Sequence, residues 1–183
     1  MAVVEKQPYQ VIRQLDGGAE LRRYPAHRVV SVDVSGGFAE SGNVGFGPLV
    51  GYISGANTES QKIAMTAPVV LEPHAEGQQT VSFVLPEAWW TKPAPTPLQP
   101  GLRIEERPET TVAALRFRGL WRESRVLEHT RILREILDTQ DLVESGDAFY
   151  ARYDPPSMPG PLRRNEVLIP VTDSSGTVAT ERS

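Results

Sequence analysis

Two segments of the chain repeat one pattern of charged residues closed by a proline, Glu20-Leu21-Arg22-Arg23-Tyr24-Pro25 and Arg103-Ile104-Glu105-Glu106-Arg107-Pro108. The stretches that follow these prolines, Arg28–Gly36 and Thr111–Gly119, are also alike. The second copy follows the first at a constant offset of 83 positions, at the prolines and at the glycines that end each stretch. Two copies of this length indicate a duplicated half-domain rather than a solenoid of short repeats.

Each copy continues into a helix with an apolar stripe. In the first half Phe46, Leu49, Val50 and Ile53 recur at helical spacing, and Pro48 suits the opening turn of a helix. In the second half a longer stripe predicts a helix over about 122–143, formed by Val126, Thr130, Leu133, Ile136 and Leu137. We therefore expect one helix in each half.

Strands account for most of the remaining periodic sequence. The first half is expected to close with strands over 62–71 and 80–85, and the second half with strands over 148–153 and 166–171. An extended stretch over 9–15 leads into Gly17-Gly18, a hairpin turn signal.

The sum is an α+β domain of duplicated halves, with about nine strands in a twisted, barrel-like antiparallel or mixed sheet flanked by two helices. We expect one domain over 1–171, with halves at about 19–86 and 102–171, and a disordered C-terminal tail over 172–183.

Composition narrows the classes of function. The chain has 183 residues and a formal net charge of −4, whereas nucleic-acid binders show a basic balance or stripe. It has no cysteine and three histidines, which excludes thiolate ligation and disfavours a histidine-rich metal centre. No signal peptide and no apolar run of membrane-spanning length is apparent, so we expect a soluble, cytoplasmic protein with no membrane span.

Three segments carry motifs of another kind: GFGPLVGYISGAN at 45–57, KIAMTAPV at 62–69 and YDPPSMPGPLRRNEV at 153–167. In this order they resemble the signatures of the SOUL haem-binding protein family, and the similarity extends from about residue 9 to residue 171. The resemblance implies a barrel-like sheet with two helices, as in small-molecule-sensing domains of the gyrase-inhibitor type. It also implies non-covalent binding of haem or another tetrapyrrole in an apolar cleft beside the first helix and the closing-hairpin loop, without one universal axial ligand.

The resemblance places Phe46 and Val50 at positions that line the pocket, although both residues could equally pack on the sheet. Asn43 and Gly51 stand where animal members of the family carry cations for the haem propionates. Arg163 is a substitute for those cations, as are Lys62 and Arg164, because arginine binds carboxylates in a bidentate geometry. For Arg164 we favour a structural role in the hairpin, with Glu166 as its partner.

Met65 and Met158 are thioethers that can contact or ligate haem iron. Core packing is the alternative for Met65, whereas Met158 lies in a proline-rich loop that can present it to a ligand. His129 is a weak candidate iron ligand, because a histidine on an apolar helical stripe is more often a satisfied boundary residue.

No catalytic motif accompanies these residues: the sequence has no nucleophile elbow, zinc-binding helix motif or phosphate loop. The leading hypothesis is a haem or tetrapyrrole carrier for buffering or transfer, and not an enzyme. The alternatives are a binding or sensing domain for another apolar small molecule, and an enzyme that acts on such a ligand.

Overall fold

The computed structural model describes residues 4–74, 77–155 and 157–173. Within this part of the chain lie two α-helices, α1 (Phe38–Ile53) and α2 (Glu123–Asp138). The strands are β1 (Glu5–Lys6), β2 (Gln10–Gln14), β3 (Glu20–Tyr24), β4 (His27–Ser35), β5 (Thr66–Ala67), β6 (Val69–Pro73), β7 (Gln78–Val84), β8 (Leu102–Arg107), β9 (Thr110–Arg118), β10 (Leu142–Glu144), β11 (Phe149–Arg152) and β12 (Arg164–Asp173).

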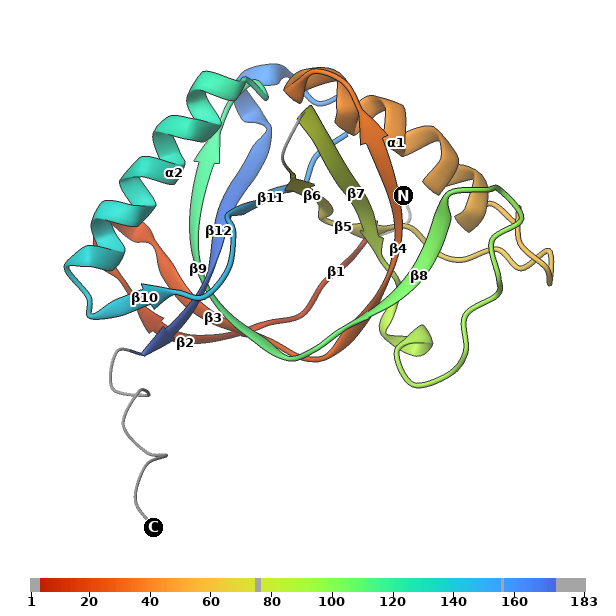
Figure 1. Ribbon diagram of the computed structural model, residues 1–183, viewed down its shortest axis with the longest axis horizontal. Helices are drawn as coiled ribbons and strands as arrows, with labels where there is room; N and C mark the ends of the chain where they lie inside the picture. Colours follow the sequence, from red (N-terminus) through yellow and green to blue (C-terminus); the bar gives the residue numbers. More distant parts are fainter. Residues whose placement is uncertain (1–3, 75–76, 156, 174–183) are drawn as a thin grey trace, which may run out of the picture.

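The main sheet is antiparallel and curls into a half-barrel. Its strand order is β2-β3-β9-β12-β11-β6-β7-β4-β8, with β10 paired to β12 off this path. Figure 1 shows both helices outside the curl, α2 over β9 and β12, and α1 over β4 and β7. Neither of the two helices in the described residues therefore lies on the concave face of the sheet. The predicted α+β class, with about nine strands and two flanking helices, is confirmed.

The two halves exchange their first strands. β3 pairs with β9 of the second half, and β8 pairs with β4 of the first half. Tyr24 lies opposite Thr110 and His27 lies opposite Arg107, so the pairing keeps one register through both proline bends. The two proline bends therefore lie side by side, where the strands of one half pass into the sheet of the other.

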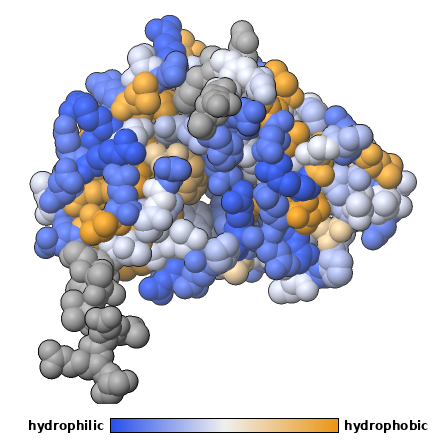
Figure 2. Space-filling view, viewed as in Figure 1, coloured by the Kyte–Doolittle hydropathy of each residue, from blue (hydrophilic) through white to orange (hydrophobic). Residues whose placement is uncertain are grey.

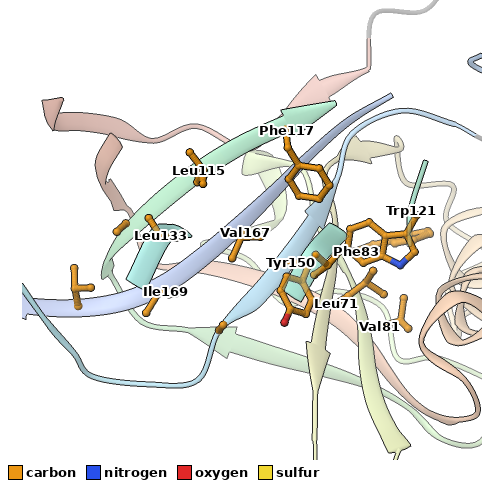
Figure 3. Packing of buried hydrophobic residues seen from close by; sticks show 14 of the residues in the cluster. Leu71, Val81, Phe83, Leu115, Phe117, Trp121, Leu133, Tyr150, Val167 and Ile169 are labelled. Atoms are coloured by element: carbon orange, nitrogen blue, oxygen red, sulfur yellow. The ribbon is translucent and has the colours of Figure 1, made fainter. Parts of the chain in front are cut away.

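Alternation along β4 separates the two faces of the sheet. Val30, Val32 and Val34 are buried toward α1, while Ser31 and Asp33 point to the concave side and bond Ser82 and Thr80. Figure 3 shows the same apolar layer in the second half, where Leu115 and Val167 pack with Leu133 of α2. On the outer surface, Figure 2 shows hydrophobic residues in separate patches between hydrophilic ones.

Both helices differ from their predicted bounds. α1 begins at Phe38, so Pro48 lies in its interior and not in its first turn. Proline there removes the hydrogen bond to the carbonyl of Val44, which is 57% exposed and so lies within reach of water. α2 ends at Asp138 rather than near 143, because Asp141 adopts a positive φ of 54° and the chain turns into β10.

The expected strand over 62–71 is also divided. Pro68 has no N–H to donate to a ladder and separates β5 from β6, while residues 62–65 form a loop. At the C-terminus, Thr172 and Asp173 continue β12, and 174–183 of the expected tail lie outside the described residues. No helix in the described ranges is long and apolar enough to span a membrane.

Candidate ligand site beside helix α1

Two glycines bring the N-terminal half of α1 close to the sheet. A Cβ atom on Gly45 would lie 2.7 Å from a methyl group of Val81, and one on Gly42 would lie 2.9 Å from Nη1 of Arg152. These distances are shorter than a carbon atom tolerates. The glycines of this helix therefore set its depth on the sheet and place its backbone against the Arg152 side chain.

Phe46 lies one turn beyond Gly42, on the same side of α1. Its ring meets Phe83 edge-on, with centroids 5.3 Å apart, yet 39% of the residue stays exposed. Val50 is half-buried against the core, and Leu49 and Ile53 are fully buried beneath it. Asn43 is exposed. The helix thus presents a partly covered aromatic ring and a neutral polar side chain to solvent.

Arg152 supplies a cation that the helix lacks. It projects from β11 on the same face as Tyr150, and its guanidinium lies 5.5 Å from the ring centroid of Trp121. Burial, and then the charge of Arg163, lowers the pKa of Arg152 from its ordinary value. No ion pair joins Arg152 to a carboxylate among the residues whose side chains the structure describes, which leaves out 38–41. Because arginine stays charged in proteins, the site holds a partly buried positive charge that an anion would compensate.

The closing-hairpin loop adds two of the predicted residues. Nε of Arg163 donates a hydrogen bond to the main-chain carbonyl of Met158 at 2.9 Å, and both residues are half-buried. The positive charge of Arg163 also contributes to lowering the pKa of Arg152. We call the group formed by Asn43, Phe46, Trp121, Arg152, Met158 and Arg163 the α1 site.

Four other candidates lie apart from this group. Met65 is half-buried and packs against the core, Lys62 is exposed on the loop before β5, and Gly51 is partly exposed with open space at its Cβ position. His129 stacks on Phe117 with centroids 4.3 Å apart. Its Nδ1 donates to the carbonyl of Arg125 at 2.7 Å.

The polar residues of the family-like motifs mainly hold the fold. Asn57 is 1% exposed, and its amide donates to the carbonyls of Tyr52 and Gln61 and accepts from two main-chain N–H groups. Arg164 pairs with Asp154 at 2.7 Å and not with Glu166. The expected pairing with Glu166 is wrong because the carboxylate of Glu166 is bound by Arg22 and Arg116 instead.

Two cavities lie away from the α1 site. One of about 420 Å³ opens on the concave face, and one of about 540 Å³ lies among polar residues that include Arg116, Tyr153 and Glu166. Neither contains any of the six residues first assigned to ligand binding. In the described part of the chain, no three His, Asp or Glu side chains are grouped so that they could hold a metal ion.

Arg152 is the candidate site residue that sequence reasoning missed. Alternation along β11 places it on the same face as the buried aromatic residue Tyr150, so the strand carries an arginine on an apolar face. That pattern is the signal that could have found it, because a charge in such a place requires compensation.

Fold and site together define a duplicated α+β domain with external helices and a cationic, partly apolar surface at α1. The chain belongs to the SOUL heme-binding protein family, whose model matches residues 4–170. It is 31% identical to heme-binding protein 1 of Xenopus laevis over 160 residues, which is 83% of each chain. It is 32% identical to human heme-binding protein 2 over 148 residues, or 76% of this chain and 72% of the relative.

Solved structures of low sequence identity share the fold. The C-terminal domain of EcmrR superposes with a TM-score of 0.64 at 14% identity and covers 90% of this chain and 98% of that one. A hydrolase from Listeria innocua superposes with a TM-score of 0.61 at 12% identity, covering 93% of this chain and 100% of that one.

Proposed function

We propose that this protein binds haem or a related tetrapyrrole non-covalently at the α1 site. The observation that carries the proposal is the partly buried Arg152 guanidinium, which lies 5.5 Å from the buried ring of Trp121 and against the α1 backbone at Gly42, one turn before the 39% exposed Phe46. A porphyrin has the matching chemistry, with two carboxylates at one edge of an apolar plate. The names of the curated relatives point to the same ligand.

In this arrangement Arg152 and Arg163 receive the propionates, and Phe46 and Met158 contact the macrocycle. Burial of a few hundred Å² of apolar surface stabilises the complex by several kcal/mol at about 25 cal/mol per Å². A charge-assisted hydrogen bond to each propionate adds about 1.5–3 kcal/mol. These contributions suffice for specific binding without a bond to iron.

Iron ligation is therefore secondary in this proposal. His129 is stacked on Phe117 of β9 and hydrogen-bonded within α2, so both of these contacts are made outside the α1 site. We expect metal-free protoporphyrin IX to bind with an affinity within a few-fold of that of hemin, and His129→Ala to leave both affinities unchanged.

The direct test is a hemin titration of the purified full chain, followed at the Soret band. Arg152→Met should weaken binding about 10- to 100-fold, since each tenfold corresponds to about 1.4 kcal/mol. The matched control is Arg131→Met, which removes an exposed arginine of α2 and should leave the affinity unchanged. Non-saturating binding by the wild type, or equal affinity of the two variants, would refute the α1 site.

A second comparison isolates the carboxylates. Hemin dimethyl ester keeps the macrocycle and iron but presents no anion to Arg152. It should bind the wild type more weakly than hemin binds Arg152→Met, because the ester loses the bonds to both Arg152 and Arg163, and Arg152→Met should weaken binding of the ester much less than binding of hemin. Phe46→Ala should weaken hemin and its ester alike, because it removes apolar contact only.

A role in buffering or transfer follows from the openness of this surface. Phe46 is 39% exposed, so a bound macrocycle keeps an edge that a second protein can reach. We expect hemin to pass from the loaded protein to apomyoglobin faster than it dissociates from a fully enclosed site. Transfer on a timescale of days would argue for storage instead.

A further inference from the structure

The cavity of about 420 Å³ on the concave face is separate from the α1 site. It lies inside the curl of the sheet seen in Figure 1, on the side opposite the helices. Its volume is within the roughly 300–1,000 Å³ of small-molecule sites. Its apolar lining comes from five strands of both halves: Val29, Val70, Val112, Phe149 and Leu168.

The exchanged first strands create this cavity. Val29 and Val112 occupy matching positions of the two repeats, 83 residues apart, and both line it. The proline bends close one end, where Tyr24 lies opposite Thr110 and His27 lies opposite Arg107. Because each half supplies a wall, the cavity exists only in the joined molecule.

The lining combines an apolar surface with polar side chains. Val112, Phe149 and Leu168 supply the apolar surface of the second half. The polar side chains include Glu72, which pairs with Arg107 of the second half at 2.7 Å, the imidazole of His27 and the exposed Asp147. Burial lowers the pKa of His27, so this ring is neutral near pH 7.

Arg107 also contacts Glu105 at 3.3 Å, and so its positive charge is already shared by two carboxylates. Asp147 is exposed, so a cation would gain only a solvent-screened partner there in exchange for the hydration that it loses. A neutral group that donates a hydrogen bond loses less, and carboxylate and imidazole acceptors are at hand.

We propose that the concave-face cavity binds an uncharged aromatic molecule of two or three fused rings that carries one hydroxyl or N–H group. The rings lie against Phe149, Leu168 and Val112, and the polar group faces Glu72 and His27. This inference does not depend on haem binding, because none of the α1-site residues lines the cavity.

The test uses four probes of one shape: 2-naphthol, naphthalene, 2-naphthoate and 2-naphthylmethylammonium. Isothermal titration of the full chain should give the tightest binding for 2-naphthol, about tenfold tighter than for either ion. Tightest binding of an ion, or no saturable binding of 2-naphthol, would overturn the assignment.

Val70→Trp places an indole in the cavity from the centre of the sheet and should abolish 2-naphthol binding. Val143→Trp is the matched control, since Val143 is exposed on β10, and it should bind like the wild type. Should Val70→Trp fail to fold, intermolecular nuclear Overhauser effects from naphthol to Phe149 and Leu168 of the wild type decide the matter. Their absence at saturation would refute the site.

Two crossed measurements separate this inference from haem binding. Arg152→Met should keep 2-naphthol affinity, and Val70→Trp should keep hemin affinity. Displacement of 2-naphthol by one equivalent of hemin would show a shared site and overturn the inference. Failure of hemin to bind at all would refute the proposed function and leave the naphthol result standing.

Discussion

Arg22 and Glu166, 144 positions apart in the chain, form a bidentate ion pair on the concave face. Nη1 and Nη2 of Arg22 donate to the two carboxylate oxygens at 2.8 and 2.9 Å, and both residues are buried. Arg116 and the Tyr153 hydroxyl each add a bond of 2.7 Å to the same carboxylate. The first strand of one half is thereby fastened to the last strand of the other.

Removal of one member of this pair should be costly. Arg22→Met leaves Glu166 buried without its main partner, and breaking such a pair costs about 3–5 kcal/mol. Arg131→Met, which removes one partner of an exposed pair with Glu135, should cost at most about 0.5 kcal/mol. Urea denaturation measures both losses. Similar small losses for the two variants would contradict a structural role for the pair.

Stability should fall in acid. Burial acts to raise the pKa of Glu166, but hydrogen bonds and charge from Arg22 and Arg116 outweigh it and lower the pKa from its ordinary value of 4.5. The stability from a lowered carboxyl pKa is present above about pH 4.5 and is lost as pH falls through the folded-state pKa. The urea midpoint should therefore decrease steadily below pH 4.5, with a shallower slope in Glu166→Gln. Equal slopes would show that other carboxylates, such as Asp154, govern the acid response.

Alanine substitutions at two glycines of α1 should change the stability of the protein in opposite directions. Gly45→Ala puts a carbon 2.7 Å from Val81 and should destabilise the protein by about 1–3 kcal/mol. Gly47→Ala meets nothing within 4 Å and should stabilise it by about 0.5–1 kcal/mol. Thermal denaturation at one pH measures both changes. A loss of stability in both variants would mean that helix depth is not the constraint.

Alanine substitutions of Asn57, which follows α1, and of Asn43, which lies within it, should differ in their effect on stability. Asn57→Ala removes four hydrogen bonds at a buried position and should cost about 2–6 kcal/mol, at about 0.5–1.5 kcal/mol for each bond. Asn43→Ala changes an exposed residue and should stay within about 0.5 kcal/mol of the wild type. Chemical denaturation ranks the two, and the reverse order would contradict the assignment of Asn57 as a structural residue.

Periodicity in the sequence was sufficient for the class of fold. The stripes at Leu49 and Leu133 marked both helices, and the repeat after each proline marked the long strands β4 and β9. Strand pairing could not be predicted in the same way. A proline bend between β3 and β4 suggests neighbouring strands, yet each pairs with a strand of the other half, because partner choice depends on the whole sheet.

The candidate site was less accessible from sequence. Resemblance pointed to the helix and the loop, and the structure brings Met158 and Arg163 together there. It did not point to Arg152, which is a candidate site residue because of its position beside Trp121 and Gly42. Such proximity arises from tertiary packing and leaves only a weak trace in local sequence.

The exchanged strands give the molecule the connectivity of a domain-swapped dimer folded from one polypeptide. A fragment that ended between the halves would contain β3 without its partner β9, and β4 without its partner β8. The unpaired strand edges would then favour pairing with another molecule. Truncation at the proline-rich junction should accordingly yield aggregates or reciprocal complementation between fragments, and not two independent modules.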